Sequence, residues 1–334
     1  MKTIAFFNNK GGVGKTTLVY HFSYMLAELG YTVLAADLDP QTNLTSIFLE
    51  EEQLNDIYLS EENRPTIMES IRLLDDSSGD FKPVDIVNIS ERIGLIAGDL
   101  ELSLFEDKLS YSWERCLDED KSAFRITSVF YRMLQDAGER TTADFCVIDM
   151  GSHLGALNRA VLIAADYVVL PMAADLFSLQ GIKNLGSRLT KWRKEWRDRL
   201  ARKPKINFKL PSGNMKPIGY IIMQHGIIVN RPVKAYLRWT NRIPLTYVKY
   251  VLRQSVDEHD YSNYRVESDD NCLALLKHYH SLAPLSMEAR KPIFFLKPAD
   301  GAIGAHLGAV RSAYQDFERM SNKIVNAVNS EAVV

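Results

Sequence analysis

The sequence predicts an α/β fold in which helices flank a doubly wound, mostly parallel sheet. Two observations favour this class: short apolar runs alternate with helical stretches, and a strand, a glycine loop, a helix and a second strand follow one another within residues 1–40. Hydrophobic residues make up 46% of the 334 residues, enough to cover such a sheet on both faces. We expect one domain over residues 1–334.

The first strand is expected at residues 3–7, an apolar run that ends just before the glycines. A helix is expected at residues 16–29, where apolar residues recur at helical spacing and Gly30 can terminate it. A buried strand at residues 31–36 then leads into Asp37. Because ligands of open parallel sheets bind at the carboxyl ends of strands, this edge is the expected ligand site.

Further apolar runs, each bounded by residues that interrupt secondary structure, are also expected to be strands. They lie at residues 93–97, 145–148, 167–171, 218–223 and 293–296. Helices are expected between them, for example at residues 124–134 and 181–192. Residues 201–216 contain prolines and no clear period, so we expect a linker or surface loop there.

Charge is distributed unevenly, although the net charge is only −2. Residues 37–120 contain 22 acidic and 6 basic side chains, whereas residues 183–253 contain 18 basic and 2 acidic ones. We therefore expect an acidic surface segment at about residues 50–120 and a basic segment at about residues 183–253.

The three cysteines, Cys116, Cys146 and Cys272, form no CxxC pair, so neither a disulfide framework nor a zinc or iron-sulfur site is expected. The first residues do not form a basic and apolar leader, and no apolar run reaches the roughly 18 residues of a membrane span. These observations favour a cytoplasmic protein without a membrane partner.

The run Lys10-Gly11-Gly12-Val13-Gly14-Lys15-Thr16-Thr17 is expected to bind the phosphates of ATP. Glycines allow the backbone to wrap closely around phosphate oxygens, and the following helix N-terminus attracts anions. Lys15 is expected to reach the β- and γ-phosphates, and the Thr16 hydroxyl to bind Mg²⁺. The alternative is a glycine-rich turn with two incidental lysines.

The usual consensus, GxxxxGK[ST], requires glycine at position 9, where this chain has Asn9. It matches instead the variant xKGGxxK[ST], in which Lys10 is an additional lysine. With this motif the chain resembles the ParA/MinD family of deviant Walker A ATPases, and most closely the ParA-like partitioning proteins. The resemblance extends over nearly the whole length of the chain. In that family the additional lysine contacts the nucleotide of a second subunit, so the resemblance implies an ATP-dependent homodimer with Lys10 in a catalytic role beside Lys15.

Two carboxylates follow the second expected strand, in Asp37-Leu38-Asp39-Pro40-Gln41, which is similar to the DxDPQ motif of the family. The resemblance implies that Asp39 polarises the attacking water, whereas Asp37 is expected to support the metal shell. The alternative is that both residues merely cap a turn before Pro40.

Residues 145–149 have the form of a Walker B motif, an apolar strand that ends in Asp149, which is expected to bind Mg²⁺ through water. With Thr16 and Asp37, it completes the expected metal site. The family usually has two prolines next, whereas this chain continues Met150-Gly151-Ser152-His153-Leu154-Gly155. We interpret His153 as a solvated or packing residue rather than as a catalytic base.

Two further stretches resemble the family, residues 177–181 at a helix start and residues 286–293 near the adenine. The second is shorter than usual. The residues expected to contact the base are Gln224, which follows a predicted strand, and Pro284; both could instead be ordinary loop residues.

The basic segment is a candidate DNA surface, because cations neutralise phosphates without reading sequence. The resemblance implies binding of non-specific DNA in the ATP state. The candidate residues are Lys191, Arg193, Lys194, Arg197, Arg202 and Lys203. Two alternatives remain: an amphipathic helix whose tryptophans, Trp192 and Trp196, pack on the sheet, or a surface that complements the acidic segment of another subunit.

At the carboxyl end, five apolar residues fall on one helical face: Phe317, Met320, Ile324, Val325 and Val328. MinD-like relatives use such a helix to reach membranes, but the flanking residues here carry few charges. We therefore expect a helix docked on the protein.

Taken together, the residues and the resemblance predict a Mg²⁺-dependent ATPase that dimerises with ATP and binds non-specific DNA. Its expected duty is plasmid partition, chromosome segregation or positioning of another cargo, with a ParB-like partner that stimulates slow hydrolysis and an association with the nucleoid if DNA binding holds. The alternatives are a signalling or defence-type ATPase that gates a protein effector, or a metabolic or cofactor-assembly ATPase.

Overall fold

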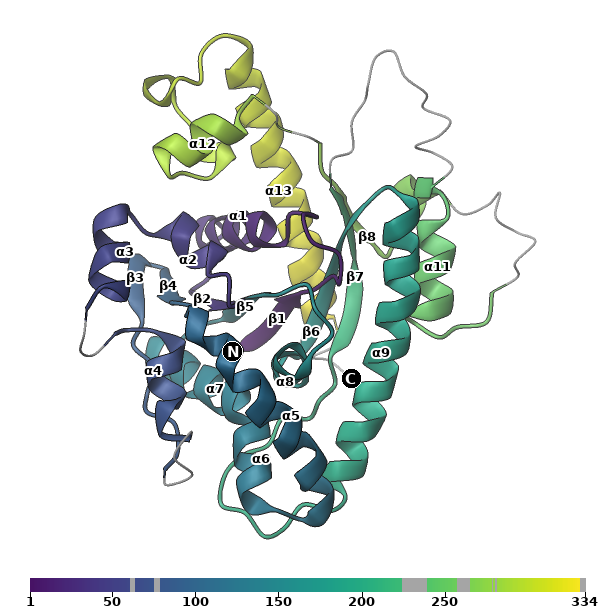
Figure 1. Ribbon diagram of the computed structural model, residues 1–334. Helices are drawn as coiled ribbons and strands as arrows, with labels where there is room; N and C mark the ends of the chain where they lie inside the picture. Colours follow the sequence, from purple (N-terminus) through teal and green to yellow (C-terminus); the bar gives the residue numbers. More distant parts are fainter. Residues whose placement is uncertain are drawn as a thin grey trace. The chain divides into compact units, whose positions relative to one another are not determined.

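The computed structural model describes residues 1–60, 64–74, 79–223, 239–256, 265–277, 279 and 281–330. Its strands form an eight-stranded sheet with the order β3-β4-β2-β5-β1-β6-β7-β8 (Figure 1). The pairs β1/β5, β2/β5, β2/β4 and β7/β8 are parallel, and the edge pair β3/β4 is antiparallel. The predicted α/β class with a mostly parallel sheet is confirmed.

The strands are β1 (Lys2–Phe6), β2 (Val33–Leu38), β3 (Val87–Ser90), β4 (Ile93–Ile96), β5 (Phe145–Met150), β6 (Tyr167–Ala173), β7 (Lys216–Met223) and β8 (Cys272–Leu275). The α-helices are α1 (Lys15–Glu28), α2 (Asn43–Phe48), α3 (Glu51–Tyr58), α4 (Ile67–Ile71), α5 (Phe105–Arg115), α6 (Lys121–Thr127), α7 (Val129–Thr141), α8 (Ala156–Ala164), α9 (Leu176–Leu200), α11 (Ile243–Tyr250), α12 (Ala283–Ala289) and α13 (Ala305–Asn329). The short 3₁₀ helices include η2 (Leu100–Leu104) and η6 (Ile293–Phe295).

One predicted strand is wrong. The run at residues 293–296 forms η6, a single 3₁₀ turn that follows Pro292. Its side chains enter an aromatic cluster, in which the Phe294 ring lies 5.4 Å from the Phe317 ring. An apolar run of this length can be buried either as a strand or as a 3₁₀ turn, so its hydrophobic periodicity does not distinguish the two.

The predicted helix at residues 124–134 is interrupted at Ser128, which separates α6 from α7. The Ser128 hydroxyl donates to the Phe124 carbonyl at 2.7 Å, a local bond that competes with helix propagation. Two strands were not predicted: β3, whose residues alternate between half-buried and exposed at the sheet edge, and the short β8.

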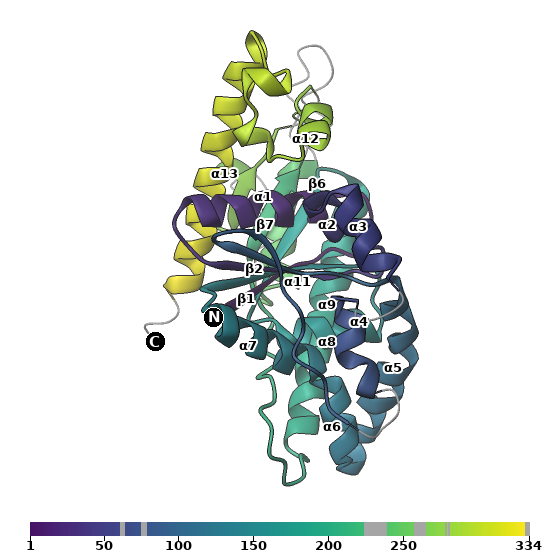
Figure 2. The same ribbon diagram turned by 90° about the vertical axis from the view of Figure 1, so that its left-hand side faces the viewer.

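The chain divides into two compact units. The first comprises Met1–Phe7, Leu26–Val168 and Lys191–Lys216. In it β2 and β5 are buried along their whole length, as expected for parallel strands covered on both faces. Helix α5 packs against α6 and α8 (Figure 1 and Figure 2). The prediction of one domain over residues 1–334 stays a prediction.

The second unit comprises Asn8–Met25, Val169–Thr190 and Pro217–Val334. Within it α13 packs against η6 and β8. The five apolar residues expected on one face of the terminal helix are all buried, which confirms a docked helix. Among the described residues, no helix combines the length and the hydropathy that crossing a bilayer requires.

Candidate nucleotide site

The glycine loop lies in the second unit, between β1 and α1. Gly12 and Gly14 have φ values of 71° and 79°, in the left-handed region that glycine adopts without strain. A Cβ added to Gly14 would lie 2.9 Å from the Met223 Cε, so this position is also crowded. The first helical bond runs from the Leu18 amide to the Gly14 carbonyl at 2.9 Å, and the loop therefore passes directly into α1.

The loop exposes backbone and buries its second lysine. Gly11 and Gly12 are exposed, whereas Lys15 is only 7% exposed. Thr16 is half-buried at the start of α1. Helix α1, which is described throughout, has no acidic residue in its first turn, so no carboxylate competes for the positive end of its dipole. Such a helix N-terminus suits an anion, as the predicted phosphate loop requires.

The first lysine of the loop, Lys10, forms an ion pair with Asp175 and keeps its side chain 32% exposed. Asp175 also accepts a bond from the Ser178 amide at 2.8 Å, at the start of α9. Partial burial raises the pKa of Asp175, but the bonds from Lys10 and Ser178 outweigh it, and the pKa lies below its ordinary value. Asp175 is therefore an ionised anchor for Lys10.

Asn9 occupies the position at which the usual consensus has glycine. Its Oδ1 atom is buried and has no hydrogen-bond partner among the residues that the structure describes. A Cβ on Gly181 of α9 would lie 3.0 Å from this atom. The neighbouring Asn8 donates to the Pro171 carbonyl at 2.6 Å and accepts from the Lys10 amide at 2.9 Å, which fixes the base of the loop.

His21 connects α1 to the stretch at residues 286–293. Its Nε2 accepts from the Ile293 amide at 3.1 Å, so its Nδ1, which lies 2.7 Å from the Thr17 carbonyl, carries the proton. The ring stacks on Phe317 with centroids 4.9 Å apart. Burial lowers the pKa of His21 from 6.5 to about 4, despite the opposing bond to Thr17.

Of the two residues expected to contact the base, Pro284 is exposed in the first turn of α12. Gln224 lies outside the described residues. Contact of either residue with adenine stays a prediction.

The predicted carboxylates lie in the first unit. Asp37 and Asp149 are register partners on the adjacent strands β2 and β5, and both are fully buried. Asp37 Oδ2 accepts from the amide and the hydroxyl of Thr45, at 2.8 and 2.7 Å. Burial raises the pKa of Asp37 to about 6, although the bonds from Thr45 oppose this shift. The Asp37 carboxylate is thus bonded to Thr45 of α2 and helps to fix that helix.

Thr45 extends this bonding to the end of β4. Its hydroxyl accepts from the Gly98 amide at 2.9 Å, and the Gly98 carbonyl accepts from the Tyr58 hydroxyl at 3.0 Å. A Cβ on Gly98 would lie 2.9 Å from the Asp37 Cγ, so only glycine allows this approach. The segment after β4 therefore packs directly against Asp37.

Asp39 is half-buried, and its Oδ1 accepts from the Gln41 amide at 3.0 Å. A Cβ on Gly151 would lie 3.4 Å from this oxygen and 3.2 Å from the His153 ring. The Asp39 carboxylate and the His153 imidazole therefore border the same glycine in the loop after Asp149.

Side chains from outside the loop hold the residues after Asp149. The Asn158 amide donates to the carbonyls of Gly151 and His153, at 2.8 and 2.5 Å. Glu106 of α5 accepts from the amides of Ala156 and Leu157, at 2.5 and 2.7 Å, and so caps α8. His153 is exposed and accepts from the Gly155 amide at 3.2 Å, which is consistent with a loop-packing residue.

Among the described residues, no three His, Cys, Asp or Glu side chains gather into a group that could hold a metal ion. The donors expected for Mg²⁺ are all oxygen atoms, which suit this hard cation. Mg²⁺ usually takes one or two carboxylates together with substrate phosphates and water, so the expected residues fit such a shared site rather than a cage made by the protein alone. The three cysteines are free and buried.

In the basic segment, both predicted tryptophans are buried, which agrees with the packing alternative. Trp196 stacks on Trp113, with centroids 5.8 Å apart, and donates to the Pro211 carbonyl at 2.9 Å. Arg193 is half-buried and donates to the Met215 carbonyl at 2.6 Å. The other candidate cations are exposed: Lys191, Lys194, Arg197, Arg202 and Lys203.

Three residues near the predicted ones were not anticipated: Asp175, Thr45 and Glu106. Asp175 precedes a helix, and an N-capping signal at that point could have indicated it. Thr45 lies eight residues from Asp37, and Glu106 lies 50 from Ala156. Neither of these spacings is a local signal.

Comparison with known proteins was consistent with this arrangement. Residues 1–202 match a family described as an AAA domain. The chain is 28% identical over 187 residues to the sporulation initiation inhibitor protein Soj of Bacillus subtilis, a match that covers 55% of this chain and 63% of Soj. It is 29% identical over 191 residues to the chromosome partitioning protein ParA of Caulobacter vibrioides, covering 55% of this chain and 61% of ParA. The chain thus spans less than two thirds of the length of these relatives.

Solved structures agree over nearly the full chain. Protein DIP2308 from Corynebacterium diphtheriae superposes with a TM-score of 0.72 at 22% identity, covering 98% of this chain and 99% of that one. The complex of Cyanothece McdA with ATP gives a TM-score of 0.62 at 18% identity, covering 98% and 96%. At such identities the likeness shows the fold alone.

Proposed function

This chain belongs to the ParA/MinD-like family of P-loop ATPases, and from that premise we propose that it is an ATP-dependent dimerisation switch. In the proposal, ATP and Mg²⁺ join two copies, the dimer binds non-specific DNA in the cytoplasm, and slow hydrolysis separates the copies. The cargo is a plasmid, a chromosome or another body to be positioned, and a partner protein stimulates hydrolysis.

The observation that carries the proposal is the contrast between the two lysines of one glycine loop. Lys15 is buried, as suits a cation that neutralises the phosphates bound by its own loop. Lys10 lies nearer the surface and is oriented by Asp175. A partly exposed lysine at the head of a phosphate loop is suited to reach the nucleotide of a second copy.

The remaining residues fit hydrolysis of that nucleotide. Mg²⁺, when bound, would neutralise charge that develops on the phosphates. The Thr16 hydroxyl and Asp149 are the residues expected to hold it. Asp37 is bonded to Thr45, so its proposed part is to support the metal shell rather than to bind the ion directly. Asp39 is half-buried and is the residue that would orient the attacking water.

The proposed output is DNA binding through the exposed cations of the basic segment. The positions of Lys194 and Arg197 on the exposed side of α9, and of Lys203 in the loop that follows, suit contacts with a phosphate backbone. Trp192 and Trp196 anchor the helix from its buried side, so these cations stand on a fixed support.

Light scattering with and without ATP tests the switch, and repeating it with non-specific duplex DNA at two salt concentrations tests the output. We expect a monomer that becomes a dimer with ATP, and DNA binding that requires ATP and weakens as salt rises. A mass that does not change with ATP would contradict the dimerisation switch.

A second candidate function is a signalling or defence-type ATPase that gates a protein effector. The residues after Asp149 favour it, because they lack the two family prolines and are held by Glu106 of another helix. In the experiment above, dimerisation with ATP but no DNA binding at either salt concentration would favour this candidate.

A further inference from the structure

The turn that follows β2 carries Asp39 and ends in a strained residue. Thr42, which precedes α2, has a φ of 53°, in the left-handed region. A β-branched side chain is rarely found there, because its Cβ crowds the backbone. The Thr42 amide donates to the Asp39 carbonyl at 2.9 Å, so the turn closes at this residue. Such strain persists only where neighbouring groups hold it in place.

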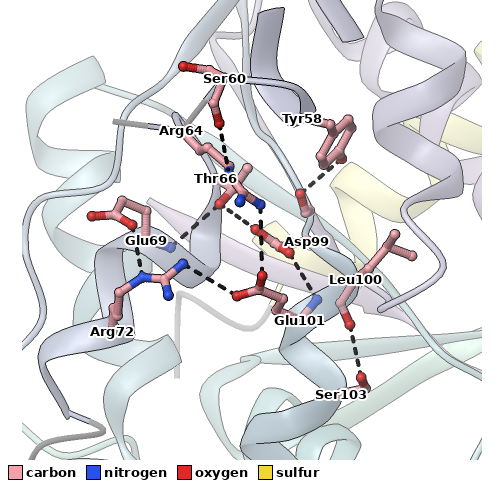
Figure 3. A network of polar contacts seen from close by, with 11 residues as sticks. Tyr58, Ser60, Arg64, Thr66, Glu69, Arg72, Asp99, Leu100, Glu101 and Ser103 are labelled. Carbon is pink, nitrogen blue, oxygen red and sulfur yellow. Dashed lines mark hydrogen bonds and ion pairs between the residues drawn. The ribbon is translucent and has the colours of Figure 1, made fainter. Parts of the chain in front are cut away.

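Tyr58, the last residue of α3, reaches this turn from outside it. Burial raises the pKa of the Tyr58 hydroxyl above its ordinary value, and the hydroxyls of Thr42 and Thr45 oppose this shift. The phenol therefore keeps its proton at neutral pH and lies beside both threonines. It donates that proton to the Gly98 carbonyl at 3.0 Å (Figure 3).

Gly98 connects Tyr58 to Asp37 through directed hydrogen bonds. The Gly98 amide donates to the Thr45 hydroxyl at 2.9 Å, and that hydroxyl donates its own proton to Asp37 Oδ2 at 2.7 Å. The other carboxylate oxygen, Oδ1, accepts from the Asp39 amide at 3.3 Å. Hydrogen bonds in such a chain reinforce one another, so the orientation of the Gly98 peptide bears on both predicted carboxylates.

The far side of the same segment is held without Tyr58. The Thr66 hydroxyl donates to the Asp99 carboxylate at 2.7 Å (Figure 3). Nearer the surface, Arg72 donates to the Glu101 carboxylate at 3.3 Å. Because these bonds keep the segment in place, we expect removal of the phenolic hydroxyl to change the orientation of one peptide rather than the fold.

Helix α3, which carries Tyr58, has few buried contacts of its own. The structure describes the whole helix, and only Ile57 in it is buried, whereas its acidic side chains, Glu51, Glu52 and Asp56, are exposed. An element with so few buried contacts has a low local stability. The Tyr58 hydroxyl therefore connects the predicted carboxylates to an element of low local stability.

We propose that Tyr58 is a positioning residue for ATP hydrolysis, which holds the turn that carries Asp37 and Asp39 in the form that hydrolysis requires. It acts through the Gly98 peptide and by supporting the strained Thr42. Because neither of these residues belongs to the predicted phosphate loop, hydrolysis should depend on the phenol, whereas ATP binding should not. The consequence for hydrolysis rests on the proposed function.

Tyr58→Phe keeps the ring and removes the hydroxyl. We expect kcat for ATP to fall by about three- to tenfold with KM unchanged, the usual effect of losing one hydrogen bond that matters only for the chemical step. Phosphate release at increasing ATP concentration measures both constants. Two control variants should keep the kcat of the unchanged chain: Tyr111→Phe, which removes an exposed hydroxyl bonded to Arg115, and Arg72→Gln, which removes ion pairs near the surface (Figure 3).

A second background, Thr42→Gly, separates positioning from general destabilisation. Glycine adopts the left-handed conformation without strain, so the turn needs less support from the phenol. We expect Tyr58→Phe to lower kcat by a smaller factor in a chain that carries Thr42→Gly than in the unchanged chain. A loss of stability unrelated to the turn would lower kcat by the same factor in both backgrounds.

Hydrogen–deuterium exchange without nucleotide tests the positioning itself. In Tyr58→Phe the amides of Thr45 and Gly98 should exchange about three- to tenfold faster than in the unchanged chain, whereas the amides of β5 should not. Because this measurement needs no ATP, it is independent of the proposed function.

Unchanged exchange at these two amides would overturn the proposal, whether or not the chain hydrolyses ATP. Faster exchange with an unchanged kcat would also overturn it, as would equal losses of kcat with and without Thr42→Gly. If both amides respond as expected but the unchanged chain hydrolyses no ATP, the proposed function is contradicted instead.

Discussion

The glycine loop and the loop after Asp149 follow neighbouring β-strands, yet their shapes have different origins. The turn of the glycine loop is set by its own residues, since Gly12 and Gly14 adopt positive φ and α1 begins at once, while Asn8 and Lys10 at its start bond to Pro171 and Asp175. The loop after Asp149 depends on Asn158 and on Glu106, which comes from a separate helix. The turn of the proposed phosphate loop is thus determined mainly by local sequence, whereas the surroundings of the proposed hydrolytic residues depend on distant parts of the chain.

The largest expected effect tests whether hydrolysis can be separated from binding. Asp39→Ala should reduce ATP hydrolysis by roughly 10²–10⁴-fold, the usual contribution of a positioned acid–base group, while ATP binding persists and the dimer accumulates. Phosphate release and light scattering with ATP measure the two results. Turnover at the unchanged rate would remove Asp39 from the hydrolytic role.

The second prediction concerns the helix behind the glycine loop. The pKa of His21 is lowered from 6.5 to about 4 in the folded chain, so between these pH values the unfolded chain binds a proton at His21 and the folded chain does not. Above pH 6.5 the neutral His21 ring makes its full contribution to the free energy of unfolding. As the pH falls from 6.5 towards about 4, the free energy of unfolding decreases by up to about 3 kcal/mol. Urea unfolding at neutral pH and at about pH 5 measures this loss.

The matched variant for that measurement is His21→Gln, which cannot titrate. Carboxylates contribute equally to the pH dependence of both chains, so the difference between them isolates His21. Identical losses of unfolding free energy in both chains would contradict a buried neutral imidazole.

The third prediction separates the two lysines of the glycine loop. Lys10→Ala should keep ATP binding but weaken ATP-dependent dimerisation by about 10–100-fold, since a hydrogen bond to a charged group contributes about 1.5–3 kcal/mol. Dilution series in light scattering measure the dimer. Asp175→Asn is the companion variant, because it frees Lys10 while retaining the lysine. Dimers of undiminished affinity in Lys10→Ala would remove Lys10 from the interface.

The smallest expected effect concerns the distant support of the second loop. Glu106→Gln removes the negative charge at the start of α8 and should lower the free energy of unfolding by about 1 kcal/mol. Thermal unfolding measures it, with Asp107→Asn, an exposed neighbour on the same helix, as control. If both variants have the same melting temperature, the cap contributes nothing.

The same contrast explains what could be predicted from the sequence. The buried strands and the glycine loop were predictable, because period, composition and glycine spacing are local signals, and the docked terminal helix followed from its apolar face. The 3₁₀ turn at residues 293–295 was not, because tertiary packing decided its form. Glu106 is tied to the site through a contact between distant residues, which no local pattern encodes. An N-capping signal could have indicated Asp175, but not its ion pair with Lys10.

The stacked indoles of Trp113 and Trp196 should also give a spectroscopic signal that reports on the position of α5. Their planes differ by 17°, and the guanidinium carbons of Arg159 and Arg199 lie 4.1 and 4.2 Å from the Trp113 ring centroid. Transitions of two parallel indoles at this distance couple, so the pair should produce a distinctive near-ultraviolet circular dichroism band. Any ligand that shifts α5 against α9 would change that band, and the protein therefore carries its own label-free reporter at this contact.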